Sequence, residues 1–223
     1  MNDISGDYDS HKSGGEAGFL HLLSCGDPTI ASLVETIGPL SIEERRRGRP
    51  DDAYSTLVRS IVGQQLSTRA ARTIYGRVTE LFDHRPPTPV ELLAADEDTL
   101  RACGLSRAKV SYLRDLARHV LEGDLDFSSL RELPDDEVAS RLVTVKGLGR
   151  WSADMFLMFH LGRPDVLPVG DLGIRRAVER SYCLPAMPNP DELRALAKPW
   201  RPHRTLACLY LWASLDTNKL SKG

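Results

Sequence analysis

The sequence has no long apolar run. A helix that crosses a bilayer needs about 20 consecutive apolar residues, and no stretch of the 223 residues approaches that length. The N-terminus also lacks the apolar core of a signal peptide. We therefore expect a cytoplasmic protein, with 41% hydrophobic residues available to build a core.

Cysteine is scarce, and its four copies are far apart in the chain. Zinc sites and redox motifs use closely spaced pairs of cysteines, and the six histidines show no ligand spacing either. We expect reduced, buried thiols and no metal bound by these side chains. The cysteines are Cys25, Cys103, Cys183 and Cys208.

An excess of positive charge is missing as well. The formal net charge is −2, whereas nucleic-acid-binding domains are usually basic. Residues 1–17 are rich in Gly, Ser and Asp, which predicts a disordered tail, and without them the chain carries 28 basic and 27 acidic residues. The distribution of charge must therefore decide the partner. One basic group is Lys146, Arg150, Arg175, Arg176 and Arg180, and another is Arg45, Arg46, Arg47 and Arg49.

The second group is a run interrupted only by Gly48. A run of this kind is typical of a solvated face, and a contact with nucleic acid is the alternative.

Alternating strand patterns are absent too. Apolar residues recur with helical spacing between Pro and Gly breaks, which predicts an all-α fold. We expect helices to begin after Pro50, Ser67, Ser106 and Pro134, and a last apolar helix over about residues 201–215.

Two glycines mark the most informative segment, Val145-Lys146-Gly147-Leu148-Gly149-Arg150. A tight turn that leads into a helix presents backbone N–H groups and the positive end of the helix dipole. The segment therefore predicts an anion site, with a backbone phosphate as the anion. The apolar stripes on either side are Val138, Leu142 and Val145 before the turn, and Trp151, Met155, Met158 and Phe159 after it.

Three blocks of sequence together resemble the helix-hairpin-helix, Gly/Pro-rich, Asp (HhH-GPD) superfamily of DNA glycosylases, and within it the 3-methyladenine DNA glycosylase II branch. They are Ser60–Ser67, the hairpin Gly147–Ala153, and the stretch from Asp165 to Ile174 that contains Asp171-Leu172-Gly173-Ile174. The resemblance covers about residues 30–216. It implies two helical lobes with an active cleft between them. The lobes are expected at residues 18–50 with 166–223, and at residues 51–165.

The resemblance implies that Asp171 is the catalytic carboxylate. A carboxylate near C1′ of the sugar stabilises the oxocarbenium-like transition state and can orient water. The plainer alternative is an N-cap of the following helix, and both can hold. Asp165 is a weaker competitor because it lies outside the Asp-Leu-Gly-Ile block.

Trp151 stands where bifunctional members of the superfamily carry a nucleophilic lysine, so the resemblance implies a monofunctional enzyme that uses water. Their cluster of four closely spaced cysteines is also missing, which excludes an iron–sulfur cluster. Trp151, Met155 and Trp212 are the expected base pocket, and core packing is the alternative for Met155 and Trp212.

The corner Gln64-Gln65-Leu66 matches the wedge that fills the gap left by a flipped base, with Gln65 as the closest match. A turn with buried polar side chains is the alternative. The hairpin residues Lys146, Gly147, Leu148, Gly149 and Arg150 are the expected phosphate site, and the resemblance allows a structural Na⁺ or K⁺ on their carbonyls. No other cofactor is expected.

The expected function is excision of alkylated bases, such as 3-methyladenine and 7-methylguanine, from double-stranded DNA, which initiates base excision repair. The partner would be duplex DNA, and the protein a monomer associated with the nucleoid. The alternative is a helix-hairpin-helix module that binds DNA without catalysis, which the Pro168–Arg176 block disfavours. An oxidised-base lyase is disfavoured by Trp151. The sequence leaves the preferred lesion open.

Overall fold

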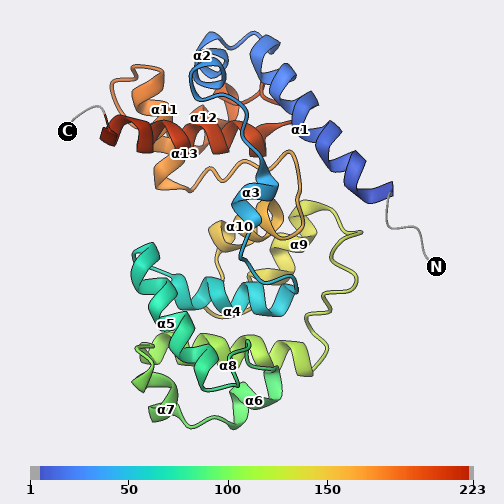
Figure 1. Ribbon diagram of the computed structural model, residues 1–223, viewed down its shortest axis with the longest axis vertical. Coiled ribbons are helices and arrows are strands. Elements are labelled where there is room, and N and C mark those ends of the chain that lie inside the picture. Colours follow the sequence, from blue (N-terminus) through green and yellow to red (C-terminus); the bar gives the residue numbers. More distant parts are fainter. Residues whose placement is uncertain (1–5, 221–223) are drawn as a thin grey trace. The chain divides into compact units, whose positions relative to one another are not determined.

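The computed structural model describes the backbone of residues 6–220 and the side chains of residues 15–216. Within these residues the chain forms thirteen helices and no strand, so the predicted all-α fold is confirmed (Figure 1). The helices are α1 (Gly6–Ser24), α2 (Pro28–Ile37), α3 (Ile42–Arg46), α4 (Ala53–Gly63), α5 (Thr68–Glu80), α6 (Pro89–Ala94), α7 (Glu97–Ala102), α8 (Arg107–Leu121), α9 (Asp135–Leu142), α10 (Arg150–Phe159), α11 (Leu172–Ser181), α12 (Pro190–Leu196) and α13 (Arg204–Leu220).

The chain divides into two compact units. The terminal unit contains Met1–Arg47 and Gly162–Gly223, and the central unit is Gly48–Leu161. The sequence had placed the changes of lobe after residues 50 and 165. The structure places the first before the Pro50 break and the second just beyond the end of α10 at Phe159.

The disordered tail predicted for residues 1–17 is wrong for residues 6–17, which belong to α1, and residues 1–5 lie outside the described part of the chain. Helix α1 packs against α2 and α13. At Gly18, α1 and α13 are so close that an added Cβ would lie 3.0 Å from the Leu206 side chain. Tertiary packing of this kind stabilises a helix whose own sequence is a weak helix former.

The core of the terminal unit surrounds α13, whose residues from Leu206 to Leu211 are all buried. This helix packs against α2 and α11. A buried carboxylate holds the surrounding segments together, because Asp27 caps α2 and also accepts hydrogen bonds from Tyr182 Oη at 2.6 Å and Trp200 Nε1 at 2.8 Å. Burial of an ionisable side chain is tolerated when its oxygens are bonded in this way.

The central unit is built around α8, which contacts α4, α6 and α7. Ser106 caps the start of α8, and its apolar face buries Val110, Leu113 and Leu116. The pair α9 and α10 forms the helix-hairpin-helix, and α10 also packs against α4. The residues that precede and follow the predicted hairpin therefore rest on the core of one unit.

The expectation of four buried thiols is only half right. Cys103 and Cys208 are buried, Cys25 is half-buried and Cys183 is exposed, although all four are free thiols. Cys183 follows α11 in a turn with φ of 51°, which leaves the side chain at the surface. Among the described residues no three His, Cys, Asp or Glu side chains are grouped as metal ligands.

No helix in the described part of the chain is long and apolar enough to span a membrane.

Gly147 lies where the hairpin touches α8, and its replacement tests this packing. Its φ is +83°, and an added Cβ would overlap the ring of Tyr112. We expect Gly147→Ala to cost about 3 kcal/mol from backbone strain and overpacking, which lowers the melting temperature by roughly 10 °C in a chain of this size.

Gly149→Ala is the matched control for this thermal unfolding experiment. Gly149 has a φ of −100°, and nothing lies within 4 Å of its added Cβ. An equal loss of stability in both variants would contradict the assignment of the Gly147–Tyr112 contact as the constraint.

Candidate active site

The hairpin joins α9 to α10 in the central unit. Helix α9 ends at Leu142, and Gly149 is the N-cap of α10 with no side-chain cap. Inside the turn, the N–H of Leu148 donates to Val145 O at 3.1 Å. The uncapped first turn of α10 presents backbone N–H groups together with the positive end of the helix dipole, and this arrangement is suited to a phosphate oxygen.

Three side chains outside the hairpin hold the turn in shape. Asp115 Oδ2 of α8 accepts the N–H of Lys146 at 2.8 Å, and Gln64 Nε2 donates to Gly147 O at 2.7 Å. The ring of Tyr112 fills the space that a side chain at position 147 would need. Sequence reasoning missed Asp115 and Tyr112, because a single Asp or Tyr on a helix carries no signal of what it faces.

The two charged residues of the hairpin differ in their surroundings. The Lys146 side chain is 67% exposed, with its ammonium 3.8 Å from Asp115. Arg150 is already paired, with Nε 2.9 Å from Asp154 and Nη1 3.1 Å from Asp136. Lys146 is therefore the more available charge for a phosphate. Leu148 is buried, so this residue can meet a ligand only through its backbone.

Asp154 lies one turn beyond Arg150 on α10 and is buried. Burial raises the pKa of this carboxyl group, and the hydrogen bond from Arg150 opposes the rise. For Arg150 itself burial lowers the pKa, but the bonds to Asp154 and Asp136 outweigh it and the pKa is raised. The Arg150 guanidinium thus links α10 to the start of α9 through these two ion pairs.

The two predicted pocket residues of the central unit both belong to α10. Trp151 is 45% exposed at the first turn of the helix, directly after the hairpin. Met155, one turn later, is half-buried. An exposed tryptophan beside a turn that is suited to an anion offers an apolar, polarizable face for a flat ring. Their assignment to a base pocket stays a prediction.

The wedge corner follows α4 and precedes α5. Gln65 has a φ of 57° and is exposed, and Leu66 is 37% exposed. Gln64 differs from both, since it is half-buried and its amide is bonded to Gly147 O. Lys109 of α8 holds the end of α4 just before the corner, because its Nζ donates to Val62 O at 2.8 Å. Burial lowers the pKa of the Lys109 ammonium group.

In the terminal unit, Asp171 is the N-cap of α11. Its Oδ1 accepts the N–H of Ile174 at 2.7 Å and the indole N–H of Trp212 at 3.1 Å. The residue is only 8% exposed. The N-cap alternative weighed from sequence is therefore correct as a description of its structure. A cap also fixes the carboxylate rigidly, as a catalytic role requires.

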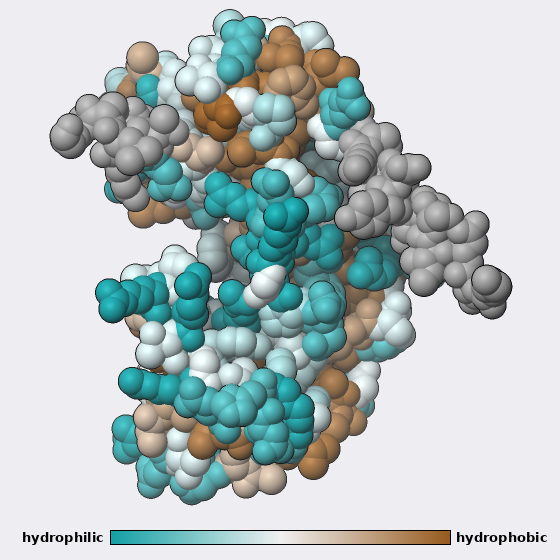
Figure 2. Space-filling model, in the orientation of Figure 1, coloured by the Kyte–Doolittle hydropathy of each residue, from teal (hydrophilic) through white to brown (hydrophobic). Residues whose placement is uncertain are grey.

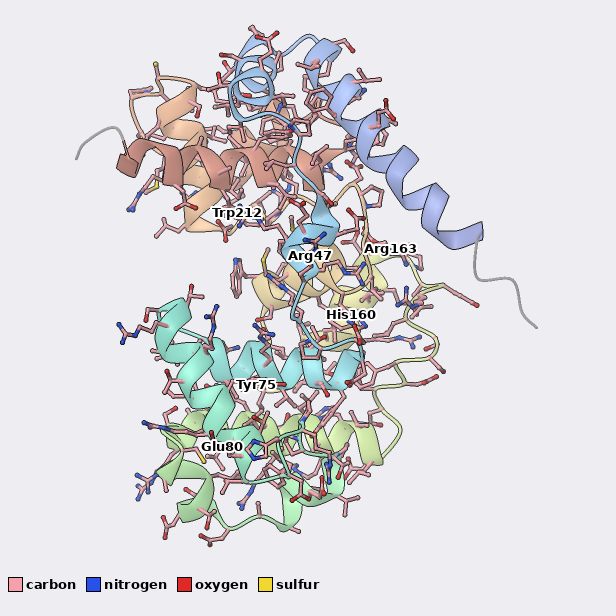
Figure 3. The ribbon with its side chains drawn as sticks, in the orientation of Figure 1. Arg47, Tyr75, Glu80, His160, Arg163 and Trp212 are labelled. Carbon is pink, nitrogen blue, oxygen red and sulfur yellow. The ribbon has the colours of Figure 1, made fainter. Side chains whose placement is uncertain are left out.

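Trp212 projects from α13 (Figure 3) and is half-buried. Its assignment to the base pocket stays a prediction, while its bond to Asp171 is a role that the sequence did not suggest. Gly173 makes the bond possible, because an added Cβ there would lie 3.0 Å from Asp171 Oδ1 and 3.2 Å from the Trp212 ring. The glycine of the Asp-Leu-Gly-Ile block was the available signal.

Asp165, the competing carboxylate, is committed to an ion pair. Its Oδ1 lies 2.7 Å from Arg204 Nε and its Oδ2 lies 3.0 Å from Arg204 Nη2. The same guanidinium also donates to the backbone oxygen of Asp165 at 2.6 Å. This bidentate arrangement fastens the loop before Asp171 to the start of α13 and gives Asp165 a structural role.

The remaining basic residues divide by their contacts. Arg176 and Arg180 are exposed on α11, whereas Arg175 Nε donates to Pro188 O at 2.8 Å. In the arginine run, Figure 2 shows hydrophilic side chains over α3, which contains Arg45 and Arg46. Arg49, in the central unit, stacks on the ring of Phe159 at 4.4 Å.

Known proteins match this chain over most of its length. The sequence profile of the HhH-GPD superfamily of base excision DNA repair proteins matches residues 58–202. DNA-3-methyladenine glycosylase 1 of Schizosaccharomyces pombe is 33% identical over 89% of this chain and 86% of its own. DNA-3-methyladenine glycosylase 2 of Escherichia coli is 32% identical over 72% of this chain. The matched region makes up 57% of that longer enzyme.

A solved structure agrees with the sequence matches. The S. pombe 3-methyladenine DNA glycosylase in complex with abasic DNA superposes with a TM-score of 0.75, at 31% identity, over 88% of this chain and 95% of its own. The chain therefore belongs to the HhH-GPD superfamily of base excision DNA repair proteins, and within it to the 3-methyladenine DNA glycosylases, which hydrolyse N-glycosidic bonds.

Proposed function

We propose that this glycosylase excises alkylated purines, of the 3-methyladenine and 7-methylguanine type, from duplex DNA as a monofunctional enzyme. The observation that carries the proposal is the buried Asp171 carboxylate, which is held through one oxygen by Ile174 N and Trp212 Nε1. Such a carboxylate is preorganised, and its placement needs no rearrangement during the reaction. The names of the relatives support the substrate class.

Asp171 would act on the sugar. Cleavage of the N-glycosidic bond leaves positive charge at C1′, and a carboxylate at about 4 Å stabilises a unit charge by roughly 4 kcal/mol at an effective dielectric near 20. That difference corresponds to about a thousandfold in rate. The same carboxylate can orient the water that attacks C1′.

Trp151 would contact the base. Its exposed indole follows the hairpin directly, and a cationic methylated purine stacked on it gains about 0.5–2 kcal/mol. No amine stands at this position, so no imine can form there and the nucleophile is water. Met155 and Trp212 complete the set of residues proposed to shape the pocket.

The exposed corner of Gln65 and Leu66 would fill the space left by the flipped nucleotide. Gln65 can form hydrogen bonds with the unpaired partner base, whereas Leu66 can only exclude water. The hairpin, through the first turn of α10 and Lys146, would hold a backbone phosphate.

A structural Na⁺ or K⁺ on the hairpin is the one cofactor included in the proposal. Val145 O and Gly147 O already accept hydrogen bonds from Leu148 N and Gln64 Nε2, but a carbonyl oxygen has two lone pairs, so the carbonyls fit a shared cation. When bound, it would add positive charge beside the phosphate. We further propose a monomeric, cytoplasmic, nucleoid-associated protein.

Asp171→Asn tests the catalytic assignment. Asparagine is also a good N-cap, so α11 should remain intact and the melting temperature should change little. Base release should fall by about a thousandfold, while affinity for duplex DNA stays within a few-fold, because this side chain meets the sugar rather than the phosphates. Single-turnover base release on 3-methyladenine, 7-methylguanine and ethenoadenine duplexes measures it.

Labile lesions leave DNA without help, so the slowest processed lesion is the stricter substrate for this comparison. Equal turnover by the variant and the parent enzyme would remove Asp171 from the mechanism.

Strand cleavage should require added alkali or heat. A lyase needs an amine that attacks C1′, and position 151 carries an indole. Incubation with lesion DNA and borohydride should therefore leave no covalent protein–DNA adduct on a denaturing gel. A trapped adduct would show that another lysine acts as a nucleophile.

Trp151→Ala should slow release of several alkylated bases by similar factors. An indole stacks on any flat ring, so selectivity should come from the lesion, and relative rates should follow the spontaneous release of each base. The side chain is 45% exposed, so its removal should not unfold the protein. Selective loss of one neutral lesion would instead indicate specific polar contacts in the pocket.

A further inference from the structure

The wedge corner and the phosphate hairpin share one support. Helix α8 donates Lys109 Nζ to Val62 O at the end of α4, just before the corner. Three residues further along, Tyr112 packs against Gly147, and Asp115 then accepts the N–H of Lys146. Both DNA-facing segments of the central unit are thus fixed to the same helix.

Gln64 adds a direct link between the corner and the hairpin. Its Nε2 donates to Gly147 O at 2.7 Å, which joins the first residue of the corner directly to the hairpin. The peptide groups on the two sides of the turn are therefore held by different partners, with Lys146 N–H on Asp115 and Gly147 C=O on Gln64. The turn is clamped between α8 and the end of α4.

The same bond separates Gln64 from its two neighbours. Gln65 and Leu66 are exposed, and Gln65 has a left-handed backbone conformation with a φ of 57°. Gln64 is half-buried, and its amide donates to a backbone carbonyl of the hairpin. A side chain whose donor is bonded to the protein backbone must break that bond before it can enter a DNA stack.

We propose that Gln64 is a positioning residue that locks the wedge corner to the phosphate hairpin, and that insertion into DNA is left to Gln65 and Leu66. The corner and the hairpin then keep a fixed separation, so that binding of a phosphate by the hairpin also places the wedge. This inference rests on the proposed function of the two segments and assigns a different role to the first residue of the corner.

The test is a set of binding measurements that needs no catalysis. The test variants are Gln64→Ala and Gln64→Met, and Gln65→Ala is the comparator. The control is Glu122→Gln, because Glu122 is exposed at the end of α8. Gln64→Met keeps the volume of the side chain in case the alanine variant is unstable, and melting temperatures identify folded variants. Affinity is measured for an undamaged duplex and for a duplex with a tetrahydrofuran abasic site. Fluorescence of 2-aminopurine beside that site reports unstacking.

We expect both Gln64 variants to lose about threefold to tenfold in affinity for the undamaged duplex, the range set by one hydrogen bond. The rise in 2-aminopurine fluorescence should fall only as far as the fraction of DNA that is bound falls. Gln65→Ala should lose the fluorescence rise by a larger factor than affinity for undamaged DNA. Asp115 holds the same turn as Gln64. The loss of DNA affinity in the double variant Gln64→Ala with Asp115→Ala should therefore differ from the product of the losses in the two single variants.

Two results would overturn the proposal. Gln64 variants that bind undamaged DNA like Glu122→Gln but lose the fluorescence rise would show that Gln64 itself inserts. Variants unchanged in both measurements would show that the Gln64–Gly147 bond has no role. If the parent protein binds duplex DNA but releases no alkylated base, the proposed function fails while this comparison remains valid.

Discussion

The central unit depends on one buried carboxylate. Asp115 is almost wholly inside the protein, yet its two oxygens face Arg118 at 3.0 Å and the backbone N–H of Lys146 at 2.8 Å. A buried carboxylate is tolerated in that position because these donors replace the hydrogen bonds that water would make. The backbone of the hairpin is thereby drawn to a defined place on α8.

The same physical rule governs the other buried carboxylates, with different results. Asp27 binds Tyr182 and Trp200 and joins segments of the terminal unit, and Asp154 holds Arg150 as a strut. Asp171 follows the same rule, because its Oδ1 accepts hydrogen bonds from Ile174 N and Trp212 Nε1. Burial and hydrogen bonding alone therefore do not separate Asp171, the proposed catalytic group, from the other buried carboxylates. The distinction comes from the Asp-Leu-Gly-Ile block, where Gly173 leaves room for Trp212 beside the carboxylate.

Charge illustrates the difference between composition and placement. The chain has a net charge of −2, and the structure uses many of its ions internally: Arg150 with Asp136 and Asp154, and Arg204 with Asp165. What remains for a polyanion is local, such as the exposed Lys146 and the uncapped first turn of α10. A helix terminus binds a phosphate through fixed dipoles, so a protein of this kind can bind DNA without a basic composition.

The sequence by itself determined the all-α class, the hairpin, the Asp171 block and the family, because these depend on local features: helical periodicity, two glycines at a turn, and residues adjacent in the chain. The partners of those residues were decided only by the tertiary structure. Asp115 and Lys146 are 31 residues apart, Asp171 and Trp212 are 41 apart, and Gln64 and Gly147 are 83 apart.

The same applies to α1. Its polar, glycine-rich sequence suggests disorder, whereas in the structure the helix packs against α13 at Gly18. Hydrogen bonds and close packing act over a few ångströms in space, and the order of residues along a chain does not record which distant side chain the fold will bring to that distance.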